Sequence, residues 1–391
     1  MIDGPIPGKR GIDTVFRVNA LNRRLVTALT AVSVTMTPTL LAAPKAVRIT
    51  PPAGTAAWLA DSRRLPDPLR TDPVAVHRFL AAVSEAEQRG LVSEYPGVVG
   101  ALDGAPPAMR YAANDQAMTA AGSPFSERNG QFLLFDPRGD GLVAQVFGDL
   151  SAADRIAVLV PGAANRADNF WTGVGGERHR APAVQAADLR EAAARYGTTD
   201  KDRFAVVAWL GYDTPDGVDV SAAREDLART GAVALNRFVA GLSAVRPQAT
   251  IALLGHSYGS TVIGLAAPAF PPRVTDIAVF GSPGMGVNTV AQLGTTARVW
   301  AGQSSGDWVR RVPGVRLFGL GHGTKPTDPA FDARVFGTSD VADHDHYLSP
   351  GTDSLANLAS IAVKGLVAYA QGQCRERKVQ RLRLMTVHKG H

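Results

Sequence analysis

One stretch of the chain decides its fold class: Thr250-Ile-Ala-Leu-Leu-Gly255-His256-Ser257-Tyr258-Gly259. It joins a continuous apolar run to a Gly-x-Ser-x-Gly pentapeptide, and residues 260–267 that follow are compatible with a helix. A serine between a buried strand and a helix is typical of a nucleophile elbow, because glycines on either side let the two elements approach. We therefore predict that Ser257 is a nucleophile and that the Tyr258 N–H, at the helix N-terminus, stabilises an oxyanion. A tight structural turn is the alternative.

Outward from this stretch, short apolar runs alternate with amphipathic segments. Continuous runs such as 156–160 and 204–209 are typical of parallel strands that are buried on both faces. Because parallel strands joined by helices need right-handed crossovers, residues 131–373 are predicted to form a mostly parallel, three-layer α/β sheet. The expected strands are 131–136, 142–147, 155–160, 204–209, 250–254, 276–280 and 297–301, and the expected helices lie near 181–196, 222–243 and 258–268.

Three further segments flank this α/β region. Residues 55–125 have a helical pattern in which Asp72-Pro73 marks a helix start and Gly90 its end, so we expect a helical brace or cap. In residues 1–50, basic residues precede a mostly apolar run, which is the order of an export signal. Residues 374–391 form a basic tail. The pattern favours a protein that is exported or associated with the cell envelope. The alternatives are a membrane-surface anchor or a shorter, cytoplasmic protein extended by an upstream start.

Composition and charge exclude several classes of protein. With 45% hydrophobic and 19% charged residues in a chain of 391, the composition is globular and excludes wholesale disorder. The formal net charge is +6, but residues 1–50 and 374–391 each carry +5, so the body between them carries −4. A basic face that reads nucleic acid is therefore not expected. The single cysteine, Cys374, excludes an internal disulfide, Cys-rich zinc sites and iron–sulfur clusters.

A second oxyanion donor is expected where the third strand ends. The apolar run 156–160 leads directly into Pro161-Gly162-Ala163, and Gly162 lets the backbone turn towards the nucleophile. We predict that the Ala163 N–H is this donor, with an ordinary Pro-Gly turn as the alternative.

The acid is predicted by elimination along the chain. Active sites of open α/β sheets lie at the carboxyl ends of the strands. Asp276 precedes its strand and so lies at the wrong end, whereas Asp307 follows the strand 297–301 by a short loop. We therefore predict Asp307 as the acid in the order Ser…Asp…His, with a helix N-cap as its alternative role.

The base must follow the acid. His344 and His346 share a loop before a final helix around 352–370, and His322 is the next candidate. Spacing alone does not choose between His344 and His346. A His-x-His pair beside three acids could also bind a metal, but no third ligand stands at a recognisable spacing, so we predict neither a metal nor an organic cofactor.

Four residues after other strands are candidates for binding the substrate. Trp209, Tyr212 and Asp213 end the fourth strand on the face expected for Ser257, and Ser282 follows a later strand there. We predict that they line the pocket, with packing and turn formation as the alternative.

Several separated motifs resemble an actinobacterial family of α/β-hydrolase-fold proteins, a domain family of unknown function. The resemblance covers roughly residues 75–370 and implies the α/β-hydrolase fold and a Ser-His-Asp triad, without a substrate. In the family pattern the histidine before x-x-Tyr is the base, which favours His344. The motifs are Gly255-His-Ser-Tyr-Gly-Ser260, Val160-Pro-Gly162, Val207-Ala-Trp-Leu-Gly-Tyr-Asp-Thr-Pro215, Gly281-Ser-Pro-Gly284 and His344-x-x-Tyr347.

Together these observations predict a serine hydrolase that cleaves an ester or another acyl bond of a small-molecule or lipid substrate. A lipase, thioesterase, peptidase or acyltransferase would use the same triad. A non-catalytic binding protein with this fold is the alternative of a different class, and the basic ends favour contact with an anionic lipid surface.

Overall fold

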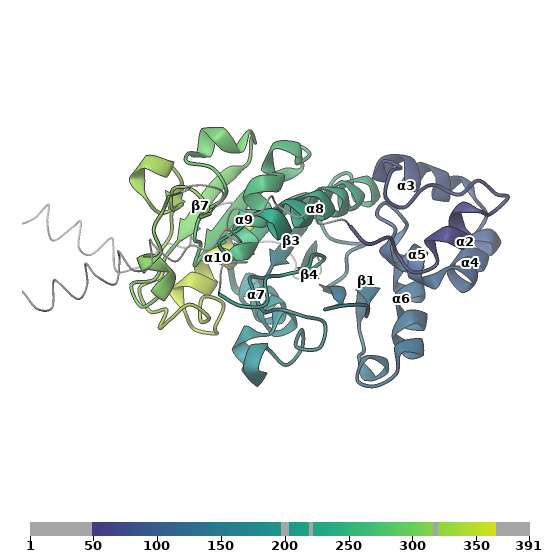
Figure 1. The fold of residues 1–391 in the computed structure, drawn as a ribbon, viewed down its shortest axis with the longest axis horizontal. Coiled ribbons are helices and arrows are strands. Elements are labelled where there is room, and N and C mark those ends of the chain that lie inside the picture. The colour runs from purple at the N-terminus through teal and green to yellow at the C-terminus, as the bar shows by residue number, and fades with distance from the viewer. Residues whose placement is uncertain (1–48, 197–202, 219–221, 316–319, 365–391) are drawn as a thin grey trace, which may run out of the picture. The chain divides into compact units, whose positions relative to one another are not determined.

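A computed structural model describes residues 49–196, 203–218, 222–315 and 320–364, which belong to one compact unit (Figure 1). The predicted export segment, apart from its last two residues, and the whole basic tail lie outside these described ranges. None of the helices within these ranges has the length and apolar character needed to cross a membrane.

Eight strands form one sheet in the order β1-β2-β4-β3-β5-β6-β7-β8. Strand β2 runs antiparallel to both of its neighbours, and every other pair is parallel. This arrangement confirms the predicted mostly parallel sheet. The strands are β1 (Gln131–Asp136), β2 (Leu142–Phe147), β3 (Arg155–Val160), β4 (Phe204–Leu210), β5 (Thr250–His256), β6 (Val274–Phe280), β7 (Arg298–Gly302) and β8 (Arg334–Val335).

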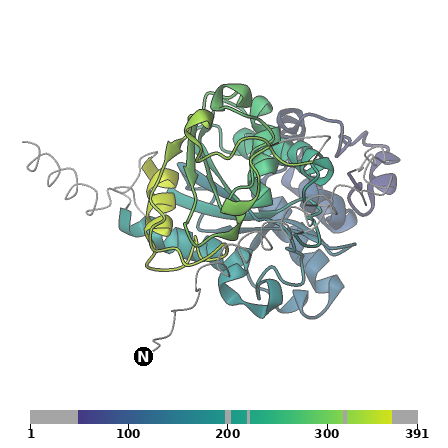
Figure 2. The ribbon, with the colours of Figure 1, turned by 60° about the vertical axis from the view of Figure 1, so that its left-hand side comes forward.

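Helices cover both faces of the sheet (Figures 1 and 2). On one face α8 (Asp226–Val245) and α9 (Tyr258–Ala266) pack against side chains from β3 and β5, and on the other α7 (Pro182–Tyr196) and α10 (Asp353–Lys364) do so. All seven residues of β4 are buried, as the continuous apolar run predicts for a strand covered on both sides. The three layers are therefore held by two hydrophobic cores that share the sheet.

Residues 55–121 form five helices with a small core of their own around the buried Trp58. The prediction that one helix ends at Gly90 was wrong. Helix α3 ends at Ala82, and Ser84 is the N-cap of the next helix, α4. Ser84 and Glu87 form a capping box, in which each side chain accepts a hydrogen bond from the backbone N–H of the other residue. The five helices are α2 (Thr55–Leu59), α3 (Pro73–Ala82), α4 (Glu85–Glu94), α5 (Pro96–Ala101) and α6 (Pro107–Ala121).

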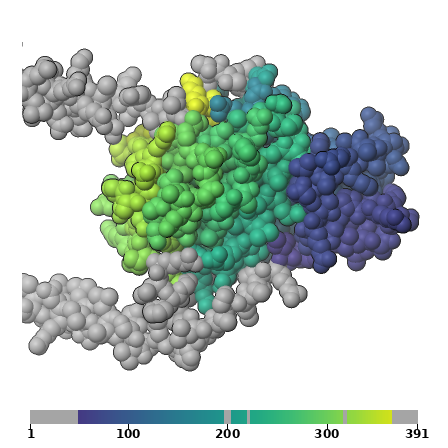
Figure 3. Space-filling view, turned by 90° about the horizontal axis from the view of Figure 1, so that it is seen from above, coloured from purple at the N-terminus to yellow at the C-terminus, as the bar shows by residue number. Residues whose placement is uncertain are grey.

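Helices α5 and α6 contact β1 at the edge of the sheet (Figure 1). In Figure 3 the helical segment is the purple and blue part of the surface, on the right. The buried Asn114 amide donates to the Phe132 carbonyl of β1 at 2.7 Å, and Arg237 of α8 donates to the Pro68 and Thr71 carbonyls at 2.8 and 3.0 Å. None of the described residues that line the pocket at Ser257 comes from this segment. In this structure the described part of the segment contacts β1 and α8 and does not line that pocket.

Candidate active site

Ser257 is the single residue between β5 and α9, and its backbone is strained. Its φ of 52° and ψ of −125° lie outside the regions that L-residues prefer, and such strain is concentrated at functional sites. The flanking glycines allow this turn: a Cβ at Gly259 would lie 2.3 Å from the Val160 carbonyl oxygen, and one at Gly255 would lie 2.9 Å from the Ser260 Cα. The turn therefore has the geometry expected of a nucleophile elbow.

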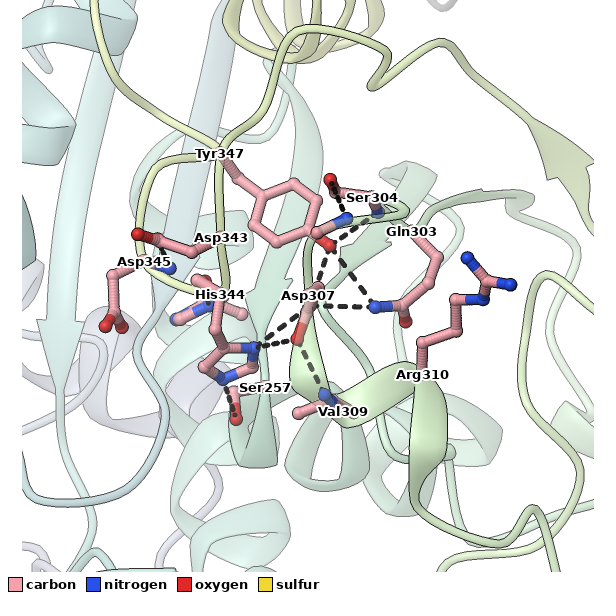
Figure 4. A network of polar contacts seen from close by, with 12 residues as sticks. Ser257, Gln303, Ser304, Asp307, Val309, Arg310, Asp343, His344, Asp345 and Tyr347 are labelled. Carbon is pink, nitrogen blue, oxygen red and sulfur yellow. Dashed lines mark hydrogen bonds and ion pairs between the residues drawn. The ribbon is translucent and has the colours of Figure 1, made fainter. Parts of the chain in front are cut away.

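Three side chains that are far apart in the sequence are linked by hydrogen bonds at this turn (Figure 4). His344 Nε2 lies 2.9 Å from Ser257 Oγ, and His344 Nδ1 lies 3.0 Å from both carboxylate oxygens of Asp307. Since the ionised carboxylate only accepts, Nδ1 carries the proton and Nε2 is left to accept the serine hydroxyl. The geometry is thus that of a nucleophile, a base and an acid that orients the base.

Asp307 is buried, and its carboxylate accepts hydrogen bonds from four residues, one of which is His344. Tyr347 Oη and Gln303 Nε2 each donate to Oδ2 at 2.7 Å, and the Val309 N–H donates to Oδ1 at 2.8 Å. Burial raises the pKa of Asp307, but the hydrogen bonds from His344, Tyr347 and Val309 outweigh burial and leave the pKa below its usual value. The bond from Val309 shows that Asp307 caps a short 3-10 helix, which is its predicted alternative role, while the same carboxylate contacts His344.

The two other candidate histidines lie away from Ser257. His346 Nδ1 is 2.6 Å from the Asp343 carboxylate, and its ring stacks on His179 at 4.0 Å between centroids. His322 Nε2 bonds the Ala222 carbonyl at 2.7 Å and so holds a loop together. Within the described ranges, no group of three or more His, Cys, Asp or Glu side chains could hold a metal ion.

The loop after β3 passes very close to Ser257. A Cβ at Gly162 would lie 2.7 Å from the Ser257 Cβ, so only glycine fits there. Ala164 has a φ of +64°, and its N–H donates to the Pro215 carbonyl at 2.7 Å. By contrast, no backbone acceptor among the described loops and caps takes the Ala163 N–H. Ala163 also lines the hollow at Ser257, and its role as an oxyanion donor stays a prediction.

Two side chains hold this loop in place. Asn165 Nδ2 donates to the Gly162 and Ala163 carbonyls at 3.0 and 3.2 Å, and Tyr212 Oη donates to the Pro161 carbonyl at 2.7 Å. Carbonyl groups that are tied down in this way orient their peptide units, and with them the neighbouring N–H groups. Tyr212 thus holds the loop from behind and does not line the hollow at Ser257.

The four residues predicted to bind substrate do not line the hollow at Ser257. Trp209 and Tyr212 are buried in the core beside α8. Asp213 lines a separate hollow, and the buried Ser282 hydroxyl lies 2.6 Å from that of Ser260. Residues at strand ends can face either a pocket or the core, and here Trp209 and Tyr212 pack in the core. The hollow itself, of about 70 Å³, is lined by Gly162, Ala163, Val174, Arg180, Gln185 and Val218, among others.

His256 makes a contact that the sequence does not predict. Its Nε2 donates to the His344 carbonyl at 2.8 Å, and its ring stacks on Phe280 at 5.3 Å. Burial, followed by repulsion from His344, lowers the pKa of His256 to about 4. It therefore stays neutral near pH 7 and ties the backbone of His344 to the end of β5, next to Ser257. The sequence predicts only a packing role for this residue, since no local pattern reveals a partner 88 residues away.

Comparisons with known proteins agree with this fold. A family model described as alpha/beta hydrolase matches residues 136–317. An uncharacterized protein of Mycobacterium tuberculosis (strain ATCC 25618 / H37Rv) is 37% identical over 167 residues, which cover 41% of this chain and 60% of the relative. A second one from the same strain is 26% identical over 377 residues, which cover 75% and 56% of the two chains. The chain therefore spans at most 60% of the length of these two relatives.

Two solved structures are also similar. One is an α/β serine hydrolase without a lid from Xanthomonas campestris, at 14% identity and a TM-score of 0.37, covering 62% of this chain and 97% of that one. The other is the esterase PE8, at 17% identity and a TM-score of 0.37, covering 56% and 97%. The strand order, the helices on both faces and the matching family model define the class: the chain has the α/β-hydrolase fold.

Proposed function

We propose that the protein is a serine hydrolase that cleaves an ester or another acyl bond through an acyl-enzyme. The observation that carries the proposal is the unbroken chain from Ser257 Oγ through His344 to Asp307, with links of 2.9 and 3.0 Å. These three hydrogen-bonded side chains lie at the carboxyl ends of the parallel strands, where sheets of this kind hold their active sites. The substrate is a small-molecule or lipid acyl compound.

The reaction follows from these contacts. Ser257 Oγ attacks the acyl carbon and its proton passes to His344 Nε2, while Asp307 stabilises the imidazolium that forms. The carbonyl oxygen gains the negative charge and is stabilised by the N–H groups of Ala163 and Tyr258. The bond to the leaving group then breaks as His344 returns the proton to that group. Water, deprotonated by the same histidine, attacks the acyl-serine and releases the acid and the free hydroxyl.

The test is labelling of the purified full chain with a neutral fluorophosphonate. Wild-type protein should label at one serine, and Ser257→Ala should not label. Ser126→Ala, which removes an exposed serine that directly follows the helical segment 55–125, should label like the wild type. His344→Ala should slow labelling by at least roughly 100-fold, because it removes the general base.

The opposite result has a clear meaning. A folded wild-type protein that does not label, or a Ser257→Ala variant that still labels, would contradict the proposal. The first of these outcomes would favour a binding protein that has kept the fold without the activity.

A further inference from the structure

A guanidinium group stands in the wall of the small hollow at Ser257. Arg180 ends the short 3-10 helix Arg178–Arg180 and lines this hollow together with Ser257 and His344. Its side chain is 33% exposed, so it is neither fully solvated nor part of the core. A cation in this position is unusual for a site that binds a purely apolar acyl chain, because partial desolvation of a charge costs free energy.

The contacts of Arg180 leave most of its donors free. Its Nε lies 3.3 Å from Oδ2 of Asp345, the residue after His344. No other residue in the described part of the chain pairs with its guanidinium, so the N–H groups on Nη1 and Nη2 have no protein acceptor there. Asp345 thus holds one edge of the guanidinium plane, and the fork formed by the two terminal nitrogens remains available.

The volume of the hollow restricts the size of the ligand. It measures about 70 Å³. Since roughly 10–15 Å³ of such volume holds one water, the space fits about five to seven atoms of that size. Much of the wall nearest Ser257 is small, formed by Gly162, Ala163 and Ala164. Gln185, which is the one glutamine among the described residues that line the hollow, already donates its Nε2 to the His179 carbonyl at 2.9 Å.

We propose that this hollow takes a short acyl group that ends in a carboxylate, and that Arg180 binds that carboxylate. The inference rests on the proposed function, because it places the acyl carbon at Ser257. A guanidinium matches a carboxylate through two parallel N–H···O bonds, which gives both affinity and orientation. Arg180 is then a specificity-determining residue that selects dicarboxylic half-esters over neutral esters of equal length.

The experiment compares two esters of equal carbon number in the acyl group, monomethyl succinate and methyl butyrate, with hydrolysis followed by pH-stat titration. Wild-type protein should have the higher kcat/KM for the half-ester. In Arg180→Gln the ratio of the two kcat/KM values should fall roughly 10- to 100-fold, the effect expected for loss of a hydrogen bond to a charged group. Arg178→Gln removes the same charge from an exposed position in the same helix and should keep the wild-type ratio.

A further variant separates substrate binding from a structural role of the ion pair. Asp345→Asn should raise the preference for the half-ester, because it removes a competing carboxylate from the hollow. If the pair only holds the two loops together, Arg180→Gln and Asp345→Asn should instead alter the ratio in the same direction. That result would overturn the proposal, as would a wild-type protein with no preference for the half-ester.

Failure of the inference and failure of the proposed function give different results. Turnover of both esters without selectivity, together with fluorophosphonate labelling of Ser257, would contradict only the proposed role of Arg180. Absence of both turnover and labelling would contradict the proposed serine hydrolase function, and with it the inference about Arg180. Labelling of Arg180→Gln by the neutral probe checks that this variant still folds.

Discussion

Replacing His256 by glutamine should flatten the dependence of folding stability on pH between about pH 4 and 6.5. His256 is buried and donates to the His344 carbonyl, and its pKa falls from 6.5 to about 4 in the folded protein. Below pH 6.5 the unfolded chain binds a proton at this histidine that the folded chain does not accept until about pH 4. Stability is therefore full above pH 6.5 and is lost as the pH falls through this window.

The size of the effect follows from the two pKa values. One group that titrates in only one state changes the free energy of unfolding by up to about 1.4 kcal/mol per pH unit. Between pH 7.5 and 4.5, the difference between 6.5 and about 4 amounts to about 2.5 kcal/mol. Glutamine keeps a side-chain N–H donor for the His344 carbonyl but does not titrate, so the variant should lack this component while keeping the contact.

The assay is urea unfolding of wild type and His256→Gln at a series of pH values. The difference between their pH profiles reports the titration of His256 together with its repulsion of His344, because titrating groups that do not interact with His256 contribute equally to both proteins. Asn114→Ala is the control: it removes buried hydrogen bonds of the brace but no titrating group, so it should lower stability equally at every pH. If His256→Gln has the same pH dependence as the wild type, the reasoning about a buried neutral histidine is refuted.

Three further changes test the geometry around the nucleophile. Tyr347→Phe removes a 2.7 Å hydrogen bond to Asp307, so the pKa of Asp307 should rise, and the carboxyl ¹³C signal of this residue should titrate at higher pH than in the wild type. An unchanged titration of that signal would contradict this. Gly162→Ala should abolish labelling, because the added methyl group would clash with Ser257. Its circular dichroism spectrum should match that of the wild type, which would show that the fold is retained. His256→Phe, unlike His256→Gln, should slow labelling roughly tenfold because no donor holds the base, a change of about 1.4 kcal/mol; equal rates in the two variants would argue against that role.

The local sequence pattern was enough to predict the sheet and the turn at Ser257. Parallel strands that are buried on both faces need continuous apolar residues, so their sequences mark them without reference to their partners. The turn is likewise contiguous, since the strand, the glycines and the helix follow one another within residues 250–267. Strand β8, by contrast, has two exposed residues and no apolar run, and only its pairing with β7 makes it a strand.

Distant contacts were decided only by the tertiary structure. His344 and His346 stand two residues apart in one loop, yet only His344 meets Ser257, while His346 stacks on His179. Trp209 could face a pocket or the core, and its packing against Phe238 decided for the core. Sequence therefore determined which residue types stand at the ends of the strands, because those patterns are local. Which of them face one another depends on how the loops are packed, and that is a property of the folded chain alone.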